Sequence, residues 1–175
     1  MENVILVDKN DNEIGIEEKL KAHSNGGHLH RAISVFLFND RKELLLQQRA
    51  ITKYHSKERW ANTCCSHPRP GESNEAAAER RLMEEMGINA KLEERFIFPY
   101  EAEVGSGLTE REYDHIFFGR YGGKPEPNKE EVQDWKWISI DEFYSWIKDK
   151  PEDFAAWVVL MADRFVEEAR KYCED

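Results

Sequence analysis

Hydrophobic residues along this chain fall into short runs separated by turn-forming residues, and each run predicts one strand. Residues Ala32 to Phe38 are almost continuously apolar, which is typical of a central strand covered on both faces. Residues Val4 to Val7 precede a turn-rich segment, so they predict an opening strand followed by a hairpin. Further strands are expected at Glu43 to Arg49, Arg95 to Ala102, Glu112 to Tyr121 and Trp135 to Ile138.

One later segment carries both the start and the stop signals of a helix. Ser73 can cap the N-terminus, Glu75 places an acid in the first turn, and Gly87 can end the helix, which predicts a helix over Asn74 to Met86. Two more helices are expected at Asp141 to Lys148 and Phe154 to Tyr172. Strands mixed with helices predict an α/β fold, with residues 1–175 forming one domain whose sheet lies between helical layers.

Charge and cysteine content narrow the class of protein. The chain has 35 acidic and 25 basic residues, so its net field repels nucleic acid and anionic membrane surfaces, and neither is expected as a partner. The longest apolar run, Ala155 to Ala162, is too short to span a bilayer, and no signal-peptide pattern is present. Three cysteines without a C-x-x-C pair argue against disulfides and a cysteine zinc site. We therefore expect a cytoplasmic protein.

Two acids have the spacing of a shared cation site. Glu110 and Glu112 are two residues apart, so on an extended segment they project from one face while Arg111 points away. Together with three imidazoles they would form a hard, high-coordination site for manganese or magnesium, and zinc could bind through the imidazoles. The candidate imidazoles are His23, His30 and His67.

The other histidines are less informative, because a single histidine is more often structural than ligating. His28 could compete with His30 for the ligand role, since the two are two residues apart. We expect His55 and His115 to be structural or surface residues.

The segment from Ser66 to Ile88 resembles the Nudix box, G-x5-E-x7-R-E-U-x-E-E-x-G-U, in which U is aliphatic. Seven positions match: Glu72, Arg80, Leu82, Glu84, Glu85, Gly87 and Ile88. Ser66 stands where the box has glycine, and Arg81 stands where it has glutamate. The resemblance implies a Nudix-type fold, a mixed β-sheet sandwiched between α-helices, and places Glu85 at a metal-ligand position.

The departure at Arg81 changes the expected chemistry. Nudix hydrolases use a glutamate there to hold the ions that split a diphosphate, and a guanidinium cannot ligate a cation. A site with Arg81 should therefore hold a diphosphate without cleaving it. With the upstream run Cys65-Ser66-His67-Pro68, the chain resembles the family of type 1 isopentenyl-diphosphate delta-isomerases, and the resemblance extends from Lys19 to about Trp157.

This resemblance implies an isomerase that interconverts isopentenyl and dimethylallyl diphosphate in isoprenoid biosynthesis. Glu112, polarised by the metal and assisted by Tyr100, would protonate the terminal alkene carbon, and Cys65 would remove the allylic proton from the opposite face. Cys64 is adjacent, but the family carries its reactive cysteine two residues before the His-Pro pair. A metal bound through His67 would lower the pKa of the Cys65 thiol.

The same resemblance assigns the groups that bind the substrate. Glu85, with a backbone carbonyl near Cys65, would hold a Mg²⁺ ion that arrives with the diphosphate. Trp157 would face the developing carbocation, to which a desolvated aromatic ring contributes roughly 2 kcal/mol. The phosphate contacts would be the basic residues Lys19, Arg49, Lys53 and Arg81.

Two other functions remain open from the sequence. A Nudix hydrolase would release phosphate or a nucleoside monophosphate, although Arg81 and Ser66 disfavour it. A diphosphate-binding module without activity would need the basic residues but not Cys65 and Glu112. In each case the partner is a small molecule, and the protein is expected to be a monomer or a homodimer.

Overall fold

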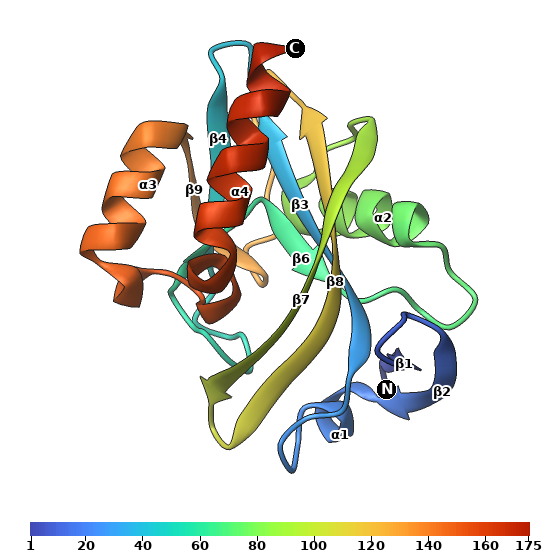
Figure 1. Cartoon of the computed structure of the whole chain (residues 1–175). Helices are drawn as coiled ribbons and strands as arrows, with labels where there is room; N and C mark the ends of the chain where they lie inside the picture. The colour runs from blue at the N-terminus through green and yellow to red at the C-terminus, as the bar shows by residue number, and fades with distance from the viewer.

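Nine strands form one mixed sheet in the computed structural model, which describes residues 1–175 (Figure 1). The strands are β1 (Asn3–Val7), β2 (Glu13–Glu18), β3 (His30–Phe38), β4 (Glu43–Arg49), β5 (Trp60–Ala61), β6 (Cys64–Ser66), β7 (Leu92–Gly105), β8 (Leu108–Arg120) and β9 (Val132–Ser139). Strands β3 and β8 are parallel, whereas the other pairings between these strands are antiparallel. Strand β3 is central, because it pairs with β1, β4, β6 and β8.

Helices cover both faces of this sheet, as expected for the α/β class. They are α1 (Lys19–Ala22), α2 (Asn74–Met86), α3 (Ile140–Asp149) and α4 (Ala156–Glu174), with a 3₁₀ turn at Pro151–Asp153. In Figure 1, α2 lies on one side of β3 and β8, and α3 and α4 lie on the other. No helix has both the length and the apolar character that crossing a membrane would require.

Alternating side chains of β3 supply two hydrophobic cores. Phe36 and Phe38 pack in a cluster with residues of α3 and α4, such as Phe143 and Phe165. Ile33, Val35 and Leu37 belong to a second cluster, which includes Ala77 and Leu82 of α2. Because both faces of the strand are buried, its sequence is apolar at nearly every position.

Helix α2 spans the predicted residues and ends where glycine is required. The Ser73 hydroxyl accepts a hydrogen bond from the Ala76 amide at 3.1 Å. Gly87 closes the helix in the left-handed conformation, with a φ of 64°. A Cβ atom at this position would lie 2.6 Å from the carbonyl oxygen of Glu126, so both conformation and space favour glycine.

Several boundaries differ from the sequence expectations. Strands β7 and β8 are longer than predicted and are joined by a tight turn, Ser106 and Gly107. The last helix begins at Ala156 and not at Phe154, because the Ala155 amide instead donates to the carbonyl oxygen of Trp60 at 2.9 Å. The short elements α1, β5 and β6 were not predicted.

One face of the β3–β8 pair changes from apolar to polar along its length. In β8, Ile116 and Phe118 belong to the core below α4, and Glu110 and Glu112 continue the same alternating face. The parallel register sets Glu112 opposite His30. The polar end of this face forms the base of the site.

Candidate active site

Three imidazoles converge on one carboxylate oxygen. The Nε2 atoms of His67, His30 and His23 lie 3.0, 3.3 and 3.7 Å from Oε1 of Glu112. The Nε2 atoms of His30 and His67 are themselves only 3.2 Å apart. All four side chains are buried, although they come from β3, β8, the end of α1 and the segment after β6. Folding thus brings four of the five predicted ligands together, whereas Glu110 groups with His23 and His55.

Hydrogen bonds on the outer side of two rings determine which nitrogen is free. Nδ1 of His23 donates to the Lys19 carbonyl and Nδ1 of His30 donates to the His28 carbonyl, both at 2.7 Å. Since carbonyl oxygens only accept, each neutral ring presents an Nε2 lone pair to the centre. Nε2 of His23 is buried with no hydrogen-bond partner. These donors fit a divalent cation.

Burial favours a lower pKa for His67 and His23, whereas contact with Glu112 favours a higher one. Burial lowers the pKa of His67 to about 4, so this ring is neutral near pH 7. For His23, burial also favours the neutral ring, but contact with Glu112 and the Lys19 carbonyl outweighs it and raises the pKa. The pKa of Glu112 lies well below its usual range, because its imidazole contacts outweigh burial. His28 does not compete, since its side chain is 54% exposed and pairs with Glu17.

Tyr100 joins the two acids of β8. Its hydroxyl lies 2.7 Å from Oε2 of Glu112 and 2.8 Å from Oε2 of Glu110. Burial raises the pKa of this phenol well above its ordinary value, and the two glutamates raise it further. Tyr100 therefore keeps its proton next to Glu112.

The two neighbouring cysteines of β6 lie on opposite faces of the sheet. Cys64 is fully buried in the α2-side core, whereas Cys65 is partly exposed and packs on the α4 side, where it lines the pocket. Burial raises the pKa of the Cys65 thiol, and the Arg49 guanidinium partly opposes this. Ionisation of Cys65 near neutral pH therefore requires additional positive charge beside it.

Four predicted basic residues line the same pocket as Cys65 and Glu112: Lys19, Arg49, Lys53 and Arg81. The free volume of this pocket is only about 30 Å³. Side chains must therefore move before a substrate of several atoms can enter.

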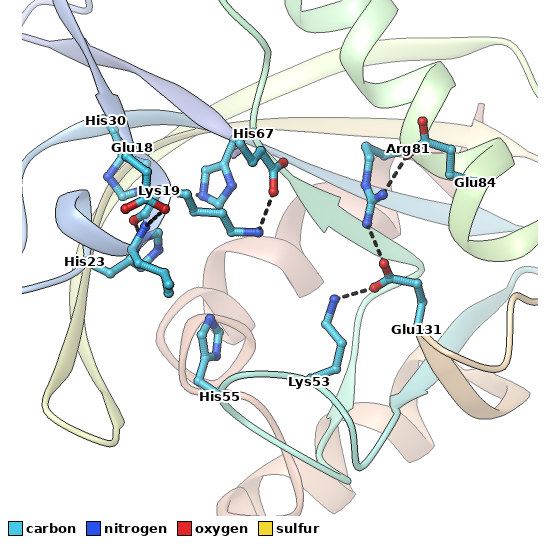
Figure 2. A network of polar contacts seen from close by, with 12 residues as sticks. Glu18, Lys19, His23, His30, Lys53, His55, His67, Arg81, Glu84 and Glu131 are labelled. Carbon is cyan, nitrogen blue, oxygen red and sulfur yellow. Dashed lines mark hydrogen bonds and ion pairs between the residues drawn. The ribbon is translucent and has the colours of Figure 1, made fainter.

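In this state, acidic side chains form ion pairs with two of the basic residues of the pocket. Figure 2 shows Glu131 between Lys53 and Arg81, where it pairs with the ammonium and lies 3.6 Å from the guanidinium. Arg81 also bonds to Glu85 at 2.5 Å. Glu85, the expected magnesium ligand, is buried and additionally accepts a hydrogen bond from Gln47 at 2.8 Å. Glu131 was not predicted, because no local motif marks it.

Trp157 belongs both to the core and to the pocket. It is 2% exposed, and its indole nitrogen donates to Oδ1 of Asn62 at 3.0 Å. The guanidinium carbon of Arg49 lies 5.1 Å from the ring centroid. Trp157 thus presents an aromatic ring beside the cations of the pocket.

Two histidines were expected to be structural or surface residues, and this expectation needs correction for one of them, His55. His115 is buried and lies 2.9 Å from Oδ2 of Asp11, a structural contact away from the pocket. His55 is also buried, but it lines the pocket, and its Nε2 lies 3.1 Å from Oε1 of Glu110. His55 lies in the loop between β4 and β5, and the sequence contains no signal of that contact.

Comparisons with known proteins identify the family of this chain. The family model for the NUDIX domain matches residues 28–160. A crystal structure of a Deinococcus radiodurans protein superposes with a TM-score of 0.78 at 17% identity, covering 93% of this chain and 98% of that one. The family-model match covers most of the chain and includes the Nudix-box helix α2. The chain therefore belongs to the Nudix family.

Curated relatives narrow the assignment. An isopentenyl-diphosphate Delta-isomerase 1 of Aromatoleum aromaticum is 49% identical over 94% of this chain and 93% of its own length. An isopentenyl-diphosphate Delta-isomerase of Pectobacterium atrosepticum is 48% identical over 90% and 87%. Within the Nudix proteins, the chain therefore belongs to the family of isopentenyl-diphosphate Delta-isomerases.

Proposed function

We propose that this chain, as one domain of residues 1–175, interconverts isopentenyl and dimethylallyl diphosphate in isoprenoid biosynthesis. The main support for this proposal is that one pocket contains Cys65 and the Tyr100–Glu112 pair together with four basic side chains. An alkene isomerase needs one group that gives a proton and another that takes one. A diphosphate-binding module would need only the cations.

The buried histidines are assigned to a divalent cation. His23, His30, His67 and Glu112 would hold it, joined by Glu110, whose carboxylate lies within 4.8 Å of a ring nitrogen of His23. Mn²⁺, Zn²⁺ or Mg²⁺ suits such a mixed nitrogen and oxygen set. The clustering of three Nε2 atoms around Glu112 supports this assignment. When bound, the cation supplies positive charge that polarises Glu112 and favours ionisation of nearby acids.

Proton transfer is assigned to residues of β6, β7 and β8. Glu112, hydrogen-bonded to Tyr100, gives a proton to the terminal alkene carbon, which leaves a tertiary carbocation. Cys65 then takes the allylic proton from the opposite face, and this completes the double-bond shift. Each transfer to or from a positioned group contributes roughly 10²- to 10⁴-fold in rate. Trp157 faces the cation and excludes water from it.

The diphosphate is assigned to the basic side chains. Lys19 and Lys53 also line an adjoining open groove of about 490 Å³, which offers a charged path toward Arg49 and Arg81. A Mg²⁺ ion that arrives with the diphosphate would be held by Glu85 and the Cys65 backbone carbonyl. Arg81 occupies the hydrolase glutamate position and contacts Glu85, which supports retention of the diphosphate.

Proton and phosphorus NMR test this proposal in one sample. Isopentenyl diphosphate is incubated with the protein, Mg²⁺ and Mn²⁺, and alkene and phosphate signals are followed together. We expect the allylic methyl signals of dimethylallyl diphosphate and an intact diphosphate. Release of phosphate would instead indicate a hydrolase, and no conversion would indicate a binding module; either result contradicts the proposal.

A further inference from the structure

His55 occupies a junction between three parts of the pocket. Its ring is buried and touches Tyr54 and Trp157 edge to face, with centroids 4.3 and 5.9 Å away. Its backbone carbonyl accepts a hydrogen bond from Arg49 at 3.1 Å. Figure 2 shows the ring rising from its loop on the side of the site where His23 lies, and their centroids are 6.3 Å apart. The ring is therefore fixed on several sides.

Both ring nitrogens of His55 have polar partners, and one of these partners is Glu110. Its Nδ1 lies 3.0 Å from the Ser56 hydroxyl, and its Nε2 lies 3.1 Å from Oε1 of Glu110. If Nε2 carries the proton, the ring donates to the carboxylate and accepts from the hydroxyl, so each polar atom is satisfied. The other carboxylate oxygen of Glu110 faces the Tyr100 hydroxyl at 2.8 Å.

From this arrangement we propose that His55 is a positioning residue that orients the Glu110 carboxylate toward the cation site of His23, His30, His67 and Glu112. The inference rests on the metal role given to Glu110 in the proposed function. A carboxylate held from both oxygens cannot rotate freely, so it loses little freedom when a cation binds. Partners that orient metal ligands commonly contribute 10- to 100-fold to metal affinity.

Direct ligation by His55 is the competing assignment. His23, His55 and Glu110 have ligand atoms within 4.8 Å of one another, so they could surround an ion by themselves. However, ligation through Nε2 would require this atom to lose the hydrogen bond to Glu110 and to present a lone pair. The contact with Glu110 therefore favours positioning.

Two amide substitutions separate these assignments. In His55→Gln the amide nitrogen can reach the place of Nε2 and still donate to Glu110, whereas the shorter amide of His55→Asn reaches only the place of Nδ1. The matched control is His115→Asn, which removes a buried imidazole that contacts Asp11 outside the pocket. Mn²⁺ affinity is measured by electron paramagnetic resonance with the metal alone, and melting in chelator shows that each variant is folded.

We expect His55→Asn to weaken Mn²⁺ binding by about 10- to 100-fold, and His55→Gln and His115→Asn to stay within about threefold of wild type. Wild-type affinity in His55→Asn would overturn the proposal. Equal losses in both His55 variants would also overturn it, because they would indicate that the imidazole itself is a ligand. The titration contains no substrate, so it can succeed or fail independently of the NMR test of isomerisation.

Discussion

The hydroxyl of Tyr100 lies 2.7 Å from one carboxylate oxygen of Glu112 and 2.8 Å from one of Glu110. A phenol has one proton, so it can donate to only one of these acids at a time. The other face of Glu112 meets three imidazoles, of which His67 is the nearest at 3.0 Å. Glu112 is thus held between the Tyr100 hydroxyl and the cation site.

Replacement of Glu112 by glutamine should abolish turnover while the protein stays folded. The amide cannot transfer a proton as the acid does, and loss of a positioned general acid costs roughly 10²- to 10⁴-fold in rate. Glu112 is buried among polar groups and lies outside both hydrophobic clusters, so the cores remain intact. Steady-state rates and circular dichroism check this prediction. Wild-type turnover in Glu112→Gln would show that Glu112 is not the proton donor.

The two neighbouring cysteines offer a matched test of the base. Cys65→Ser should abolish turnover, because a hydroxyl is a far weaker acid than a thiol and does not ionise in this pocket. Cys64→Ser should retain activity but unfold more easily, since it buries a hydroxyl in the α2-side core at a cost of about 1 to 3 kcal/mol. Rates and urea unfolding distinguish the two. The assignment fails if Cys64→Ser is the inactive variant.

Replacement of Arg49 by alanine should weaken substrate binding more than it slows chemistry. Arg49 is 5% exposed, and its Nε is buried without a partner, so the guanidinium is available to an incoming anion. We expect KM to rise at least about tenfold, the loss from one charged hydrogen bond of roughly 1.5 to 3 kcal/mol. Initial rates over a range of substrate concentrations give both constants. An unchanged KM would count against the phosphate role.

Acid should remove the stabilisation that Glu72 provides. Arg80 donates to this carboxylate at 2.7 and 2.9 Å, and these hydrogen bonds lower its pKa below 4.5. A lowered folded-state pKa stabilises the protein above the unfolded value and loses this effect as pH falls through the folded value. Glu72→Gln should therefore cost roughly 1 to 2 kcal/mol at pH 7.

The pH dependence of the stability difference between wild type and Glu72→Gln tests whether the charge of Glu72 is the cause. Urea unfolding of wild type and Glu72→Gln is compared from pH 7 downward. The two free energies of unfolding should begin to converge near pH 4.5 and become equal once the pH lies below the folded-state pKa of Glu72. A constant difference across this range would show that the substitution acts through packing or helix geometry and not through the charge of Glu72.

Patterns along the chain predicted the longer elements that carry the site, but not α1 and β6. The apolar run at Ala32 to Phe38 predicted the central strand, and the two-residue spacing of Glu110 and Glu112 predicted their common face. Both signals are local periodicities, and the strand pairings preserve them. The α/β class, with a sheet between helical layers, is confirmed for the same reason.

Other features depend on contacts that no local pattern encodes. His55 reaches Glu110, and Glu131 reaches Lys53 and Arg81, only because loops distant in sequence fold against each other. Strands as short as β6 have too few residues to show an alternation, and pairing with β3 alone defines them. Local patterns therefore found groups on regular elements, and the family resemblance found Lys53 and His67 outside them, but neither marks His55 or Glu131.

A structure with an unreactive isopentenyl diphosphate analogue and both kinds of cation tests the central claim most directly. The mechanism requires the Cys65 sulfur and the Tyr100–Glu112 pair to lie on opposite sides of the analogue's carbon chain, with its diphosphate among Lys19, Arg49, Lys53 and Arg81. If the sulfur and the carboxylate instead lie on one side, or if the carbon chain binds away from them, the account is contradicted.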